Sequence, residues 1–146
     1  MDYRRFGKKL ICRFDRGEEL VSSLQKIAEK ENIKLAEVRA LGATDDFEIG
    51  VYIVDRREYV KNHFTFPAEI TNLWGTINTM DDRYYSHLHI TVAGEDGHAY
   101  GGHLNSCKIS ATCEMIITEI EGRVDRYQDD VTGLNLFRFE GQAENE

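Results

Sequence analysis

The stretch from Ser86 to Cys107, SHLHITVAGEDGHAYGGHLNSC, constrains the fold more than any other part of this chain. In its first half, His87 and His89 alternate with apolar residues, and a period of two is typical of a β-strand with one buried face. Glu95-Asp96-Gly97 is typical of a three-residue hairpin loop, in which the glycine takes the left-handed conformation. The stretch is therefore predicted to form a β-hairpin.

The loop length decides which face of the hairpin His103 occupies. With three loop residues, counting outward places His89 opposite His103, with His87 at the diagonal position on the same face. Gly101 then falls on the histidine face and leaves room there for water, substrate or a neighbouring chain. A loop of two residues would instead shift the pairing by one and move His103 to the other face.

Three histidines on one face form a candidate metal site, composed of His87, His89 and His103. Opposed Cβ atoms in a hairpin lie about 5 Å apart and diagonal ones about 7 Å, which imidazoles can bridge with a metal about 2.1 Å from each nitrogen. Imidazole suits zinc, so the expected cofactor is zinc or another divalent metal. The alternative is three polar side chains on a solvated face. No catalytic residue is identified.

The order of the motifs resembles that of the PPC (plants and prokaryotes conserved) domain. The matching segments are RGEEL from Arg16, LGA from Leu41, FPAEITNLWGTI from Phe66, HLH from His87, GGHL from Gly101, the acidic Glu114, and RYQDDVTG from Arg126. This resemblance covers nearly the whole chain. It implies a compact α/β domain that assembles as a homotrimer and, in prokaryotic members, carries a metal on the histidine set.

The resemblance also implies DNA-binding relatives in plants. Those relatives carry a separate basic AT-hook before the domain and generally lack the histidine set, so their function does not transfer directly. The predicted domain spans residues 1–140. The acidic segment 141–146 has no apolar residue beyond one alanine and is predicted to be a disordered tail.

One segment has the pattern of a helix, and many have the pattern of strands. Asp15 and Glu18 fit a capping box, and apolar residues recur at helical spacing from Leu20 to about Asn32. Strands are predicted at 3–14, 36–43, 47–54, 58–66, 70–77, in both arms of the hairpin, and at 110–121 and 134–139. The expected fold is a single α+β domain with a largely antiparallel (mixed) sheet of about seven to nine strands and one main helix packed on it.

The charge balance bears on nucleic-acid binding. Eighteen Lys and Arg against 26 Asp and Glu give a net charge of −8, which repels a phosphate backbone unless basic residues gather on one face. The N-terminal basic cluster, Arg4, Arg5, Lys8 and Lys9, either meets nucleic acid or is an ordinary charged edge strand. DNA is therefore expected to bind weakly if it binds at all.

Three cysteines without CxxC spacing, and no apolar segment for export or membrane insertion, indicate a cytoplasmic protein with no membrane partner. Cys113 is either a core thiol or a neighbour of the metal. Glu69 is either a surface residue, or a buried carboxylate with an ion-pair partner or a place near the metal. Arg126, Asp129 and Thr132 are interpreted as a turn held by an arginine–carboxylate bond and by side-chain bonds to backbone.

These observations leave three function classes. The leading prediction is a homotrimeric metal-binding domain with a sensing or regulatory role. The second is a DNA-associated protein. The third is a metal-dependent hydrolase of a small molecule, since three imidazoles with an open fourth position resemble catalytic zinc sites. A small-molecule ligand is compatible with the first and third classes.

Overall fold

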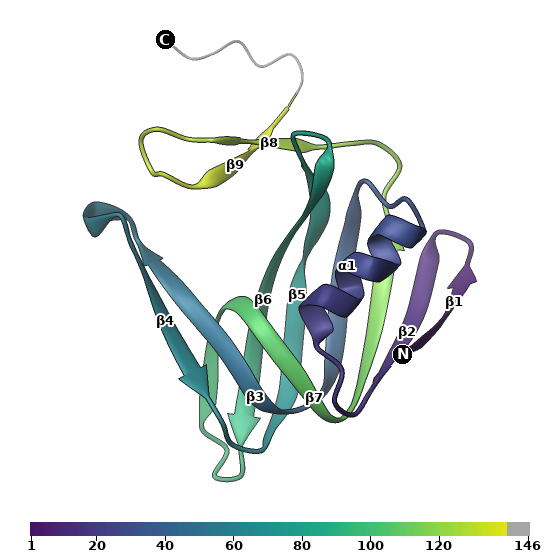
Figure 1. Cartoon of the computed structure of the whole chain (residues 1–146), viewed down its shortest axis with the longest axis vertical. Helices are drawn as coiled ribbons and strands as arrows, with labels where there is room; N and C mark the ends of the chain where they lie inside the picture. The colour runs from purple at the N-terminus through teal and green to yellow at the C-terminus, as the bar shows by residue number, and fades with distance from the viewer. Residues whose placement is uncertain (140–146) are drawn as a thin grey trace.

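The chain folds around one curved antiparallel sheet that carries a single α-helix in the described residues (Figure 1). The computed structural model describes residues 1–139, and the predicted tail at 141–146 lies outside them. The strands of the main sheet are β1 (Asp2–Phe6), β2 (Lys9–Asp15), β3 (Ala36–Ile53), β4 (Glu58–Phe64), β5 (Ala68–Met80), β6 (Arg83–Gly94) and β7 (Ala99–Glu119). The other elements are α1 (Leu20–Lys30), the short 3-10 helix η1 (Val54–Arg56), and a separate hairpin of β8 (Asp125–Gln128) and β9 (Asn135–Arg138).

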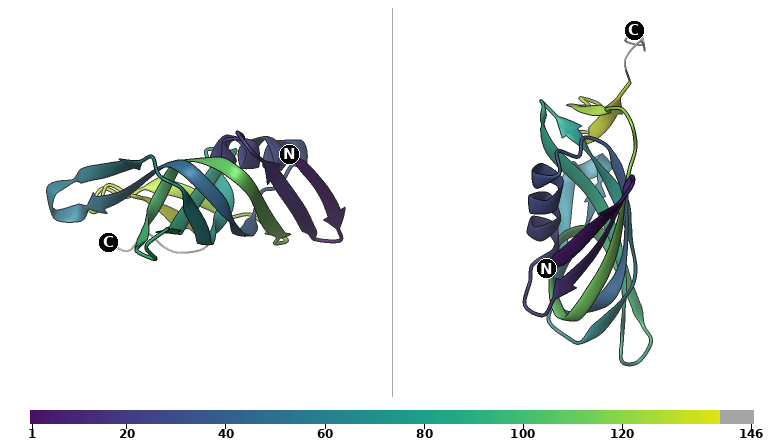
Figure 2. Two further views of the ribbon diagram at one scale, coloured as in Figure 1. Left: turned by 90° about the horizontal axis from the view of Figure 1, so that it is seen from below. Right: turned by 90° about the vertical axis from the view of Figure 1, so that its right-hand side faces the viewer.

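Two long strands bend the main sheet. The strand order is β1-β2-β7-β6-β5-β3-β4, and β7 pairs with β3 as well as with its two neighbours. Register shifts interrupt the pairing of β3 with β7 between Gly42 and Asp46 and again after Glu48. Such bulges bend a strand and increase its twist, so both strands curve around the core (Figures 1 and 2).

The predicted fold class is confirmed, although several strand boundaries were wrong. Segments 36–43 and 47–54 form the single strand β3, because the bulges absorb the turn-like residues between them. Segment 3–14 is instead two strands joined at Gly7, which has a φ of 60°. Strand β8 was not predicted, because RYQDDVTG was interpreted only as a turn.

Helix α1 packs on one face of the sheet, as Figure 2 shows. Its apolar residues Leu20, Leu24 and Ile27 recur at helical spacing and are buried. The helix ends at Lys30 rather than at the predicted Asn32, which has a φ of 54°. Within residues 1–139, no helix is long and apolar enough to cross a membrane.

The helix cap differs from the prediction. Glu19, not Asp15, is the N-cap, and its carboxylate accepts hydrogen bonds from the backbone N–H groups of Val21 and Ser22 at 3.1 and 2.7 Å. Glu18 accepts a bond from the backbone N–H of Asp15 at 2.7 Å. The residues expected to cap the helix therefore stabilise the turn that precedes it.

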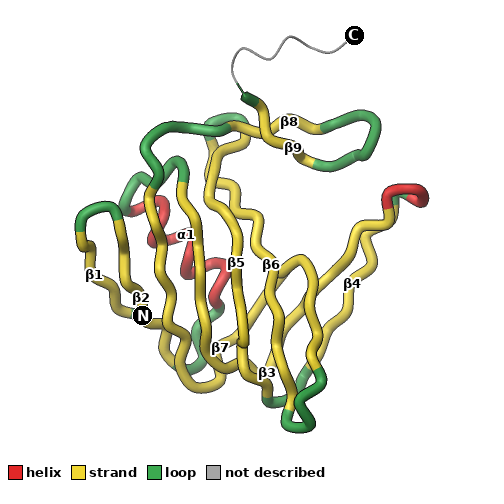
Figure 3. Tube along the Cα trace, turned by 180° about the vertical axis from the view of Figure 1, so that it is seen from behind, coloured by secondary structure: helices red, strands yellow, loops and turns green. Residues whose placement is uncertain are grey.

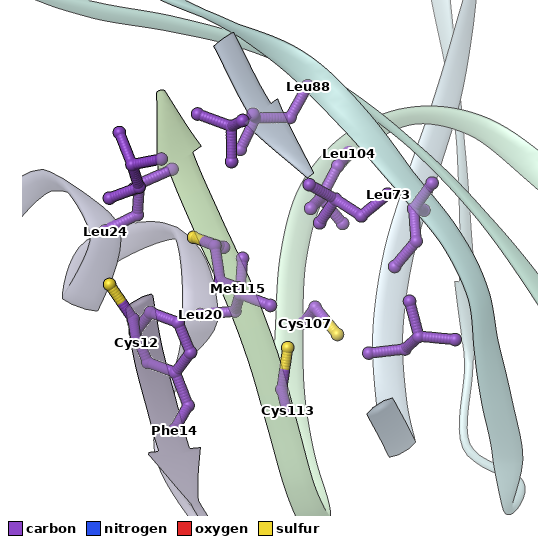
Figure 4. Packing of buried hydrophobic residues seen from close by; sticks show 14 of the residues in the cluster. Cys12, Phe14, Leu20, Leu24, Leu73, Leu88, Leu104, Cys107, Cys113 and Met115 are labelled. Atoms are coloured by element: carbon purple, nitrogen blue, oxygen red, sulfur yellow. The ribbon is translucent and has the colours of Figure 1, made fainter. Parts of the chain in front are cut away.

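The two faces of the sheet differ in character. Figure 3 shows the face away from α1, which no helix covers in the described part of the chain. The other face carries the hydrophobic core, part of which is drawn in Figure 4. The cysteines Cys12, Cys107 and Cys113 are all unpaired and buried in this core. The core-thiol interpretation of Cys113 is thus confirmed.

Candidate metal centre

Strand β6 carries two of the three candidate ligands. Its residues Leu88, Ile90 and Val92 are buried in the core. Because successive side chains of a strand point to opposite faces, His87 and His89 project from the other side of the sheet, with His87 half-buried and His89 exposed. The period of two in the sequence is therefore sufficient to place both imidazoles.

The hairpin loop brings the third histidine to the same place. The backbone N–H of Gly94 donates to the carbonyl of His98 at 3.1 Å, and Gly97 takes a left-handed φ of 79°. This is the predicted three-residue loop. His89 consequently pairs with His103 across β6 and β7, and the predicted register is confirmed.

The three imidazole rings form a compact triangle. Ring centroids are 5.0 Å apart for His87 and His89, 5.1 Å for His87 and His103, and 5.7 Å for His89 and His103. One nitrogen from each ring lies within 4.8 Å of the others. Tetrahedral coordination with bonds of about 2.1 Å places ligand nitrogens roughly 3.4 Å apart. Small rotations of the rings can bring nitrogens that lie within 4.8 Å of one another to this separation. This donor set fits zinc and leaves a fourth position for another ligand.

The electrostatics of His87 and His103 favour neutral imidazoles, the form that binds a metal. Burial, followed by the proximity of His103, His89 and Arg126, lowers the pKa of His87 to about 4. Burial and the neighbouring His89 also lower the pKa of His103. Within residues 1–139, no group hydrogen-bonds a ring nitrogen of the three histidines. The lone pairs of His87 and His103 are therefore available at neutral pH.

A pocket of about 870 Å³ opens beside the histidines, a size typical of small-molecule sites. Besides the histidines, its lining includes five aromatic side chains, those of Tyr52, Tyr59, Trp74, Tyr85 and Phe137. Gly101 lies opposite Thr91 and lines the pocket, as predicted. No Asp or Glu of the described chain is among the lining residues.

Sequence reasoning missed most of this pocket. Tyr59 comes from β4, where its ring stands edge-on to His103 with centroids 6.0 Å apart and its hydroxyl donates to the Oδ1 of Asn105 at 2.9 Å. Phe137 comes from β9. Both strands are far from the hairpin in sequence, and no local pattern indicates that they adjoin it.

Arg126 also lines the pocket, and its predicted bond to a carboxylate was wrong. Its Nε donates to the Oδ1 of Asn78 at 3.2 Å and its Nη1 to the carbonyl of Asn135 at 2.5 Å. The rest of the turn prediction holds. The Asp129 carboxylate accepts bonds from the backbone N–H and the hydroxyl of Thr132 at 2.7 and 2.6 Å.

The acidic candidates lie outside the site. Glu69 is exposed on β5, and no ion pair involves it within residues 1–139, so the surface interpretation is the correct one. Glu114 is exposed on β7, opposite Arg13 and Leu41. Neither carboxylate belongs to the histidine cluster.

The N-terminal basic cluster is largely paired with carboxylates. Arg4 contacts Asp2 at 2.6 Å. Arg5 contacts Glu31 at 2.9 Å and Glu119 at 2.6 Å, and Lys8 contacts Glu121 at 2.9 Å. These contacts favour the interpretation of the cluster as a charged sheet edge.

Residues 1–121 match the Plants and Prokaryotes Conserved (PCC) domain, and this chain belongs to that family. The match contains the whole histidine hairpin and ends before the β8–β9 hairpin. No curated protein matches the chain.

Solved structures share the fold over nearly the whole chain. A metal-containing protein from Archaeoglobus fulgidus is 33% identical, with a TM-score of 0.85 over 95% of this chain and 99% of that one. A protein from Bacteroides thetaiotaomicron, described as a candidate DNA-binding protein, is 29% identical, with a TM-score of 0.93 over 95% and 97% of the two chains. A plant- and prokaryote-conserved protein from Pyrococcus horikoshii is 22% identical, with a TM-score of 0.83 over 97% and 96%.

Proposed function

We propose that this chain is a homotrimeric domain that binds one zinc ion per subunit through His87, His89 and His103, and that the bound metal has a sensing or regulatory role. The observation that carries the proposal is the convergence of three imidazoles, each with a nitrogen within 4.8 Å of the others. The metal-containing relative from Archaeoglobus fulgidus supports it. The unpaired, buried cysteines support a reducing compartment, the cytoplasm.

Metal analysis of untagged protein tests the site. The wild type is expected to hold one equivalent of zinc per chain, and His89→Ala is expected to hold none, because two imidazoles are fewer than the three protein ligands that hold zinc in open sites. His98→Ala is the matched control. His98 lies on the same hairpin but bonds to Asp96 at 2.8 Å outside the cluster. A full equivalent of zinc in His89→Ala would contradict the assignment.

An exposed apolar patch on the sheet supports the proposed trimer. Ile11, Leu41 and Ile116 are 44, 57 and 44% exposed, and they lie on strands β2, β3 and β7 on the face away from the core. Ile11 and Ile116 pair directly. Contiguous exposed apolar residues of this kind are typical of interfaces, and we assign this patch to contacts between copies of the chain.

Light scattering tests the assembly. A trimer has a mass of roughly 50 kDa, three times the 16.8 kDa of one chain. Leu41→Asp is expected to lower the measured mass, because a charge in an apolar interface is unfavourable. Val131→Asp is the control, since Val131 is 80% exposed on the β8–β9 loop, away from the patch. A monomer mass for the wild type at micromolar concentration would contradict the trimer.

The alternative function is metal-dependent hydrolysis of a small molecule. The observation in its favour is the aromatic pocket of about 870 Å³ beside the histidines. Turnover of lactone or phosphoester substrates that stops with a chelator and is absent in His89→Ala would support hydrolysis. Zinc binding without turnover would favour the sensing role.

A further inference from the structure

Arg126 is a charged side chain in the interior of the protein, only 6% exposed. Its guanidinium carbon lies 4.7 Å from the ring centroid of Tyr85 and 4.3 Å from that of Phe137. The cation is therefore held between two aromatic rings. The hydrogen bonds to Asn78 and Asn135 hold the guanidinium plane in one orientation.

This buried cation has no counter-ion in the described chain. No Asp or Glu among residues 1–139 forms an ion pair with Arg126. An arginine has five N–H donors, and its two hydrogen bonds leave both donors of Nη2 and one of Nη1 without a partner in residues 1–139. Burial lowers the pKa of the Arg126 guanidinium, because charge is less stable away from water. An uncompensated buried charge is unfavourable, and an anion would relieve it.

The cation lies close to the proposed metal. Arg126 lines the same pocket as the three histidines. Tyr85, whose ring covers the guanidinium, precedes His87 by two residues on the same face of β6, roughly 7 Å along the strand. A ligand of a few atoms can therefore contact the guanidinium and the histidine cluster together.

We propose that this pocket binds a small organic oxyanion, a carboxylate or a phosphate ester, whose charged group pairs with Arg126 while another polar atom faces the metal position. A planar guanidinium matches two oxygens of such a group. The rings of Tyr59, Trp74 and Phe137 provide apolar walls for the body of the ligand. This inference specifies the ligand of the proposed metal site. Only the contact of the ligand with the metal rests on the proposed function, and the contact with Arg126 does not.

Calorimetric titration of the zinc-loaded full chain tests the charge requirement with three probes. Benzoate and phenyl phosphate represent the two oxyanions, and benzamide is the uncharged analogue of benzoate. At least one anion is expected to bind about 10-fold more tightly than benzamide, the factor that a charge-assisted hydrogen bond supplies. The tighter anion identifies the ligand class. Equal affinity for all three probes, or no binding of either anion, would overturn the inference.

Substitutions test whether Arg126 is responsible for the preference for anions over benzamide. Arg126→Met keeps the bulk but removes the charge, and it is expected to reduce the preference for the anion to less than about 2-fold. Arg126→Lys keeps the charge but lacks the planar guanidinium that can bind two oxygens at once. It is expected to retain an intermediate preference for the anion. Arg138→Met is the matched control, because Arg138 stacks on Tyr127 in the same hairpin but does not line the pocket. An undiminished preference in folded Arg126→Met would overturn the inference, whereas the wild-type comparison alone decides it if that variant does not fold.

Zinc content distinguishes failure of this inference from failure of the metal proposal. If the wild type holds no metal but prefers anions through Arg126, the anion pocket is supported and the metal proposal fails. If the wild type holds zinc and binds benzamide as tightly as the anions, the metal proposal stands and the anion pocket is overturned.

Discussion

The close approach of strands β5 and β6 at Gly75 provides a strong test of how the sheet positions the site. Gly75 pairs with Leu88, which lies between His87 and His89 on β6. A Cβ atom at Gly75 would overlap the backbone carbonyl of His87 and would lie 2.8 Å from the Cα of Leu88. Both are backbone atoms, so no side-chain rotation relieves the overlap. Gly75→Ala must therefore push β6 away from β5.

The size of the destabilisation follows from this steric overlap and from the strand separation that relieves it. Overpacking of a well-packed interior costs about 1–3 kcal/mol, and each of two strained ladder hydrogen bonds adds about 1 kcal/mol. Alanine recovers about 0.5–1 kcal/mol by restricting the unfolded chain. The net decrease in the free energy of unfolding is therefore about 3 kcal/mol, a large share of the roughly 5–15 kcal/mol typical of a domain.

Urea unfolding of metal-free protein measures this decrease. For a slope of about 2 kcal/mol per molar urea, a decrease of about 3 kcal/mol lowers the midpoint by about 1.5 M. Far-UV circular dichroism is the appropriate signal. Tryptophan fluorescence is unsuitable because Trp74, the single tryptophan, adjoins Gly75 and would respond to the substitution itself. Zinc affinity is expected to fall as well, since β6 moves both of its histidines relative to His103 on β7.

Gly101→Ala is the matched control on β7, the strand on the other side of β6. Its Cβ atom would lie 3.2 Å from the carbonyl of Ile90 and 3.3 Å from the Oγ1 of Thr91, so small shifts accommodate it. We expect its effect to stay within about 1 kcal/mol. If Gly75→Ala unfolds within about 1 kcal/mol of the wild type, or if both variants are destabilised equally, the argument from backbone overlap is refuted.

Three further predictions concern the metal, the thiols and DNA. Removal of the metal by a chelator should preserve a cooperative unfolding transition, because the core lies on the opposite face from the histidines; loss of that transition would show that the metal is structural. At pH 8 the folded protein should react with a thiol reagent far more slowly than the urea-unfolded chain, since burial raises the pKa of Cys113 to about 12 and of Cys12 and Cys107 to about 11; equal rates would contradict their burial. Duplex DNA should be retarded weakly or not at all at about 150 mM salt, because the net charge is −8 and the N-terminal basic cluster is largely paired with carboxylates; nanomolar binding at that salt would contradict this.

The candidate ligands could be predicted because their placement depends on local chain geometry. A period of two sets the face of His87 and His89, and a three-residue loop sets the register of His103. Both rules operate within one hairpin. The same reasoning located helix α1 but not its cap, because Asp15 and Glu19 both carry a carboxylate that can accept from backbone N–H groups, and the path of the chain decides which one occupies that position.

The sequence by itself determined the antiparallel α+β fold, the main helix α1 and the triangle of histidines, all of which follow from periodicity and turn chemistry over short stretches. Only the tertiary structure decided the bend of β3 and β7, the aromatic side chains that line the pocket, and the position of Arg126 between two rings without an ion-pair partner in residues 1–139. Those features join residues that are far apart in the chain, and their partners are set by the packing of whole strands rather than by any local pattern. Within residues 1–139 no carboxylate forms an ion pair with Arg126, yet the sequence gives it the same letter as an arginine on the surface.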